Sequence, residues 1–231
     1  TVQTNGETGS TSSGGGAGGS IYIETDRLTG SGRFYAIGGN GSNNNGGAGG
    51  GGRVLVSYND LTGFSNPNAS RVNGGTAGFG GVAENGTLGF LERDTRNLWI
   101  IGGWRWQQEE APFAFDDLRI SPTTVNGVTS VIRDDDSPAS ITVGGTLRAD
   151  GEVKWVTGGA TTITAENMAF TSGSMTFSED DLVTLVLNST GTASNYNWIA
   201  EFLTLNGEGT WTLSGSSVFQ AEQLAFNQDT F

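Results

Sequence analysis

The sequence predicts an all-β protein, specifically a right-handed parallel β-helix, a solenoid whose short strands stack one coil upon the next. Segments of alternating apolar and polar residues recur, about 33 residues apart early in the chain and about 21 residues apart later. The 39 Gly among 231 residues, with many Thr and Asn, disfavour helices. The 12 Phe, 6 Trp and 4 Tyr are too many for an unfolded chain.

The first third of the chain repeats a unit made of a glycine tract, a strand and a turn. The two clearest copies run from 14 to 30 and from 46 to 63, and each ends in a Leu-Thr-Gly triplet. A looser third copy has its strand at 87–91. The sequence leaves two interpretations of the tracts open, namely extended polyglycine segments that pack together or flexible loops.

The last third repeats a shorter unit in which apolar residues alternate, so that they share one face of a strand. Three copies of an Ala-Glu pattern occupy 165–170, 200–205 and 221–226, and similar stretches begin at Ile141 and Ile163. We expect Met168, Leu203 and Leu224 to lie in one buried column. We expect 190–195 to be a loop inserted between the first two copies. One unit cannot bury its apolar face alone, whereas stacked units can.

We expect one elongated domain over 1–231, with glycine-rich coils at 1–90, a Trp-rich middle at 91–136 and regular coils at 137–231. The pattern reaches both ends of the chain, so we also expect a segment of a longer protein. The alternative fold is an antiparallel β-sandwich or jelly roll, which also contains short alternating strands. A sandwich, however, does not repeat its sequence coil by coil.

The segment from Gly14 to Tyr58 resembles the glycine-rich β-helix repeats of very large bacterial surface and secreted proteins. In those repeats a glycine tract, a Ser-Ile-x-Ile strand and a Leu-x-Gly-Ser-Gly turn recur. The units at 165–170 and 221–226 are similar to repeats of adhesins and autotransporter passengers. The resemblance implies an extracellular or cell-surface location.

The composition excludes several classes of function. The chain has no Cys and no His, which excludes disulfides, thiolate metal sites and catalytic triads that need an imidazole. Its formal net charge of -13 repels phosphate backbones, so we expect no nucleic-acid partner. No apolar run approaches the ~20 residues of a membrane span.

Two groups of residues are candidate binding sites. Trp104 and Trp106 alternate with Arg105, so in a strand both indoles share one face, either as a stacking platform for sugar rings or as core. Asp134, Asp135 and Asp136 precede a Ser-Pro turn and form either a calcium site or a solvated acidic turn. Calcium is the one cofactor that the sequence leaves open.

We therefore expect a non-catalytic structural segment of an extracellular stalk, adhesin or filament. Its expected partners are neighbouring modules or identical subunits stacked end to end, and surface polysaccharide. A carbohydrate-binding module and a polysaccharide-degrading β-helix enzyme are the alternatives. The sequence shows no recurring pair of carboxylates of the kind that hydrolyses glycosides, so we expect no enzyme.

Overall fold

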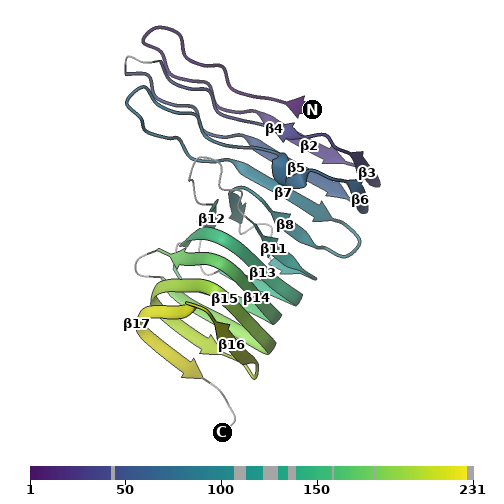
Figure 1. Cartoon of the computed structure of the whole chain (residues 1–231), viewed down its shortest axis with the longest axis vertical. Coiled ribbons are helices and arrows are strands. Elements are labelled where there is room, and N and C mark those ends of the chain that lie inside the picture. Colours follow the sequence, from purple (N-terminus) through teal and green to yellow (C-terminus); the bar gives the residue numbers. More distant parts are fainter. Residues whose placement is uncertain are drawn as a thin grey trace. The chain divides into compact units, whose positions relative to one another are not determined.

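The fold of the chain was obtained as a computed structural model that describes residues 1–42, 45–106, 113–121, 130–134, 139–157, 159–178 and 181–227. Over these ranges the chain is all-β, apart from a 3₁₀ turn, η1 (Pro67–Ala69). Each strand pairing whose register the structure describes is parallel (Figure 1). The alternative of an antiparallel sandwich is therefore wrong for the described strands.

The chain divides into two compact units. Of the described residues, unit 1 holds 1–94 and 100–104, and unit 2 holds 95–99 and those from 105 onward. The division passes through β8 (Leu98–Ile100) and β9 (Trp104–Trp106). A single elongated domain stays a prediction.

Three strands of unit 1 form a parallel sheet: β2 (Ser20–Glu24), β5 (Arg53–Tyr58) and β7 (Thr87–Glu92). Ile21 lies beside Val54, and Val54 lies beside Leu88, which confirms the three predicted repeat copies. Two further parallel pairs are β1 (Val2–Gln3) with β4 (Phe34–Tyr35), and β3 (Arg27–Gly30) with β6 (Asp60–Phe64). The Leu-Thr-Gly triplets thus lie in paired strands and not in the predicted turns, and they are displaced by one residue, because Thr29 lies beside Gly63.

Backbone hydrogen bonds hold the glycine tracts of unit 1. Their N–H groups donate alternately to two neighbouring segments of the chain. In the first tract, one N–H donates to the second tract, and the next N–H donates across to the segment 4–7. The four bonds are Gly15 N to Gly47 O (2.9 Å), Gly16 N to Glu7 O (2.8 Å), Gly18 N to Gly50 O (2.9 Å) and Gly19 N to Thr4 O (2.6 Å). Their directions therefore repeat every three residues.

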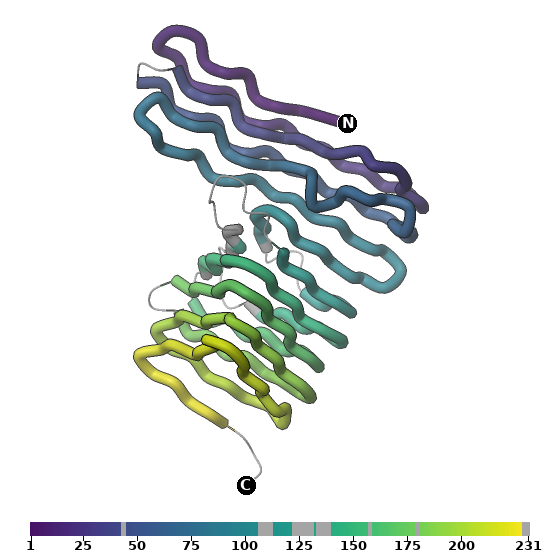
Figure 2. Tube along the Cα trace, viewed as in Figure 1, coloured from purple at the N-terminus to yellow at the C-terminus, as the bar shows by residue number. Residues whose placement is uncertain are grey.

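A three-residue repeat is that of the polyproline II helix, which has no internal hydrogen bonds and leaves its backbone groups to neighbours. In agreement, the tracts 14–19 and 46–52 contain no residue with a positive φ. In the second tract, the N–H groups of Gly49 and Gly52 donate across to Gly39 and Ala36. The tracts are therefore packed, extended polyglycine segments and not flexible loops (Figure 2).

Glycine is required where the backbones of these segments approach each other most closely. A Cβ added to Gly39 would collide with the carbonyl group of Glu7, and one added to Gly38 would collide with the carbonyl oxygen of Gly49. Gly47 differs, because it is exposed and a Cβ there would meet no heavy atom within 4 Å. Within the tracts, a Cβ at Gly15 would likewise collide with the carbonyl group of Gly39, so the packing requires glycine at some positions of unit 1 and not at others.

Unit 2 contains three long strands: β13 (Ala139–Thr157), β14 (Thr161–Phe177) and β15 (Leu182–Asn206). A coil is each stretch of chain that pairs in parallel with the equivalent stretch before and after it. Shorter strands continue the stacking on either side, namely β10 (Phe113–Phe115), β11 (Leu118–Ile120) and β12 (Ser130–Asp134) beside β13, and β16 (Thr210–Ser214) and β17 (Val218–Asn227) beside β15. Ile141 lies beside Ile163, and Ile163 beside Leu185, so successive coils are offset by 22 residues there.

Inward residues of successive coils lie in continuous columns. One column runs through Val153, Met175, Trp198 and Phe219, and another through Leu118, Leu147, Met168, Gly191 and Trp211. A corner between the straight parts of the coil repeats as well, with left-handed φ values at Gly151 (81°), Ser172 (50°), Asn195 (53°) and Gly215 (63°). Gly and Asn are the residues that adopt this conformation at least cost.

Two predicted details of the register are wrong. Leu203 lies beside Leu224, but Met168 lies beside Gly191 and not in their column. Residues 190–195 are not an inserted loop, because they belong to β15 and lie between β14 and β16. The alternation there is hidden because Gly191 faces inward and the indole of Trp211 occupies the space of its absent side chain.

Candidate functional site

An outward-facing column of apolar residues crosses the sheet of unit 1. Tyr22 lies beside Leu55, and Leu55 lies beside Gly89, whose neighbours in the strand, Leu88 and Phe90, are buried in the core. A Cβ at Gly89 would collide with the indole of Trp104, so this ring lies where the side chain of residue 89 would be. Tyr22, Leu55 and Trp104 thus form one stripe across three strands, which we name the Tyr22 column.

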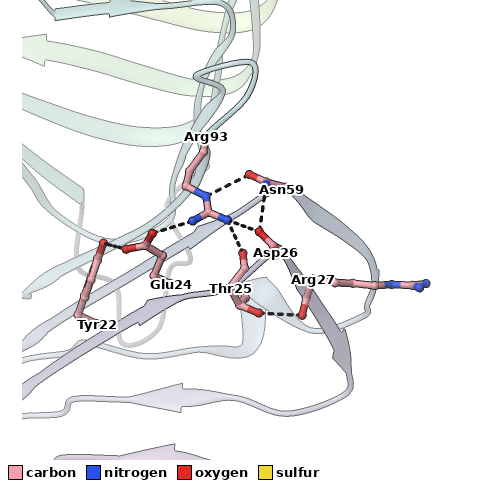
Figure 3. A network of polar contacts seen from close by, with 7 residues as sticks. All are labelled: Tyr22, Glu24, Thr25, Asp26, Arg27, Asn59 and Arg93. Atoms are coloured by element: carbon pink, nitrogen blue, oxygen red, sulfur yellow. Dashed lines mark hydrogen bonds and ion pairs between the residues drawn. The ribbon is translucent and has the colours of Figure 1, made fainter.

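A network of charged and polar groups borders this column (Figure 3). Arg93, which directly follows β7, has a side chain that is 28% exposed and forms ion pairs with Glu24 (2.7 Å) and Asp26 (2.8 Å). Its Nε donates to Asn59 Oδ1 at 3.0 Å, and its Nη2 donates to the carbonyl oxygen of Thr25 at 3.2 Å. One guanidinium therefore joins three successive coils of unit 1.

Tyr22 connects the column to this network, because its hydroxyl donates to Glu24 Oε2 at 3.1 Å (Figure 3). This hydrogen bond to a carboxylate raises the pKa of Tyr22 above its ordinary value. Tyr22 is nevertheless 64% exposed. Nearby, hydrogen bonds from the hydroxyl and N–H of Thr62 lower the pKa of Asp60.

Replacing Arg93 by Met is expected to destabilise unit 1 by about 1–3 kcal/mol, because several charge-assisted hydrogen bonds between coils are lost together. Arg27→Met is the matched control. Arg27 is more exposed and forms one ion pair, with Asp60 at 3.1 Å, so its loss costs about 0–1 kcal/mol. Urea denaturation of both variants measures the difference, and equal stabilities would contradict the joining role of Arg93.

The structure describes the side chains of only some of the candidate site residues that the sequence analysis singled out. Trp104 lies in the Tyr22 column and is half-buried, and it begins β9, so the strand that a shared face of the two indoles requires is present. For Trp106 only the backbone is described, so a shared face of the two indoles stays a prediction. Asp135 and Asp136 lie outside the described residues, and Asp134 is described only as the last residue of β12. Within the described ranges, no three His, Cys, Asp or Glu residues are grouped so as to hold a metal ion.

Trp99, another aromatic residue of the Trp-rich middle, contacts Arg119 within unit 2. The guanidinium of Arg119 lies 4.5 Å from the centroid of the Trp99 ring. Arg119 Nε donates to Ser121 Oγ at 2.9 Å, and Nη2 lies 3.5 Å from Asp150 Oδ2. Trp99 is therefore in contact with a residue of its own unit, but it is half-buried and lies between the inward residues Leu98 and Ile100, so a core role of the Trp-rich middle stays a prediction.

Sequence reasoning missed Tyr22, Leu55 and Arg93. The signal for the first two is their equivalent position in two repeat copies, one residue after the inward Ile21 and Val54. Nothing in the sequence points to Trp104 as the third member, because it comes from outside the repeat and fills the space above Gly89.

The comparisons with family models, curated proteins and solved structures found no match to this chain. Within its described part, the chain has no helix long and apolar enough to cross a membrane. The function is therefore argued from the geometry of the chain itself.

Proposed function

We propose that this chain is a non-catalytic structural segment of an extracellular or cell-surface protein, such as a stalk, adhesin or filament, folded as a right-handed parallel β-helix. The observation that carries this proposal is the parallel pairing of β13, β14, β15 and β17 over most of their lengths. A solenoid is the arrangement in which each unit contacts only its neighbours. Right-handed crossovers between parallel strands prevail in about 98% of cases, which favours the right-handed form.

The resemblance of 14–58 to glycine-rich β-helix repeats of bacterial surface proteins supports the same role. Polyglycine segments joined by backbone hydrogen bonds present few side chains for chemistry, and a repeated scaffold suits a stalk. An antibody against the chain is expected to label intact cells of the source organism. Labelling that appears only after the cells are permeabilised would contradict the proposed location.

The non-catalytic role is tested separately by incubation with neutral and acidic polysaccharides. We expect neither new reducing ends nor unsaturated products. Release of either product at a rate that depends on the amount of chain would favour the degrading enzyme instead.

We also propose that the coil formed by β16 and β17 pairs with identical subunits or neighbouring modules. Several of its apolar residues are exposed, namely Leu213, Val218, Leu224 and Phe226, the last at 66%, and all of these but Val218 continue inward columns of β15. An exposed apolar edge strand is a template for further strand pairing.

The isolated chain is therefore expected to self-associate as its concentration rises. Light scattering measures this, and the double variant Leu224→Lys with Phe226→Lys is expected to stay monomeric because charged edge residues block pairing. Leu182→Lys, a change at an exposed residue that begins β15, is the control. A wild-type chain that is monomeric at every concentration would contradict the proposed pairing.

A further inference from the structure

We infer that the Tyr22 column of unit 1 is a binding site for a linear, neutral glycan, whose pyranose rings lie across successive strands. This inference concerns a ligand and is independent of the scaffold role proposed above. It rests on the position of three apolar side chains and on the polar groups beside them.

The column has the dimensions of a stacking platform. Tyr22 and Leu55 lie on neighbouring strands, and the Trp104 ring lies over the next one. Strands are about 4.8 Å apart, so the two aromatic residues are separated by two strand spacings, roughly 10 Å. Aromatic rings at both ends with Leu55 between them can support the apolar faces of consecutive sugar rings.

Polar groups border the column where sugar hydroxyls would lie. Glu24, which accepts from the Tyr22 hydroxyl, is two residues further along the same strand face (Figure 3). Asp26 is 91% exposed at its side chain, although it pairs with Arg93. Arg53, which comes two residues before Leu55 in β5, is exposed and borders the column at the end away from Glu24. A few carboxylates and guanidinium groups around an apolar surface are typical of sites that orient a small polar ligand.

The width of the column argues against a protein as the occupant. Aromatic residues bury about 150–250 Å² each. Three side chains therefore supply less than the ~800 Å² that a specific protein partner buries on each side. A linear chain needs only a strip one side chain wide.

The local charge argues for a neutral glycan. Glu24 and Asp26 lie at one border of the column, and the whole chain carries a formal net charge of -13. Arg93 pairs with both carboxylates and Arg53 is exposed beside the column, so the border has no excess of positive charge to attract an acidic polysaccharide, whereas its carboxylates accept hydrogen bonds from the hydroxyls of a neutral one.

Calorimetric titration of the full chain with cellohexaose, mannohexaose and laminarihexaose tests the inference, with polygalacturonate as the acidic comparison. We expect at least one neutral hexaose to bind. Tyr22→Ala is expected to weaken that binding by about tenfold, which corresponds to about 1.4 kcal/mol and lies within the range of an aromatic stacking contact. Tyr22→Phe keeps the ring and should retain most of the affinity.

Phe79→Ala is the matched control, since Phe79 is an exposed aromatic residue of unit 1 outside the column. It should leave the affinity unchanged, and circular dichroism should show that all variants keep their strands. Absence of binding to all three neutral hexaoses, or binding of polygalacturonate alone, would overturn the inference. So would equal losses in Tyr22→Ala and Phe79→Ala, or in Tyr22→Ala and Tyr22→Phe. None of these outcomes bears on the scaffold role.

Discussion

Replacing Gly39 by Ala is expected to destabilise unit 1 by about 2–4 kcal/mol, because the added methyl group forces two backbone segments apart. The Cβ would collide with the carbonyl group of Glu7 and crowd the N–H of Gly16. The N–H of Gly39 also donates to Gly16 O at 2.8 Å, so the displacement breaks a hydrogen bond between the segments. Urea denaturation followed by circular dichroism measures the change.

Gly47→Ala is the control for this substitution. Its Cβ points into open space, and its φ is not in the left-handed region. Ala at this position should leave stability unchanged or raise it by about 0.4–1 kcal/mol, because the unfolded chain loses freedom. Hydrogen exchange would locate the effect of Gly39→Ala in the tracts. Equal stabilities of the two variants would mean that the tracts are not packed as described.

Replacing Trp198 by Ala is expected to destabilise unit 2 by about 3–5 kcal/mol, the cost of removing a large side chain from a core. The Trp198 ring is fully buried, and its centroid lies 4.3 Å from that of Phe219 and 4.9 Å from that of Phe170. Tyr196 and Trp211 complete the cluster, with centroids at 5.2 Å and 5.5 Å. The loss of Trp198 therefore leaves a cavity between three coils.

Leu182→Ala provides the comparison, because Leu182 begins the same strand but is exposed. Its cost should stay within about 0.5 kcal/mol, as for surface substitutions in general. Thermal and urea unfolding measure both variants, and near-ultraviolet circular dichroism reports the aromatic cluster. A Trp198 variant as stable as the Leu182 variant would contradict the buried column.

The strands and much of their stacking could be predicted from the sequence because the inward residues alternate and recur. Ile141, Ile163 and Leu185 stand at equal offsets and pair as neighbours. The same reasoning failed at Gly191, where a glycine faces inward and a tryptophan of the next coil fills its space. Because the apolar side chain comes from the next coil, the apolar alternation is interrupted at Gly191 itself.

The glycine tracts and the candidate site were harder to predict for different reasons. Polyglycine has no side chains to alternate, so only the directions of its backbone hydrogen bonds reveal the three-residue repeat. The Tyr22 column combines two residues from repeat copies with Trp104, which comes from a segment outside them. Of this site, the sequence predicted Trp104 alone.

The most direct test of the stacked coils is disulfide formation between Cys residues introduced at Thr164 and Val186, which lie side by side in the parallel register of β14 and β15. Their Cα atoms should be about 4.8 Å apart, within the range that a disulfide spans. The chain contains no Cys of its own, so no other thiol competes.

Thr142→Cys with Val186→Cys places the thiols two coils apart, because Thr142 lies beside Thr164. That distance, about 10 Å, is too long for a disulfide. Mass spectrometry after mild oxidation of the monomer should show an intramolecular disulfide in the first variant and free thiols in the second. Free thiols in the first variant, or a disulfide in the second, would contradict the parallel stacking of the coils.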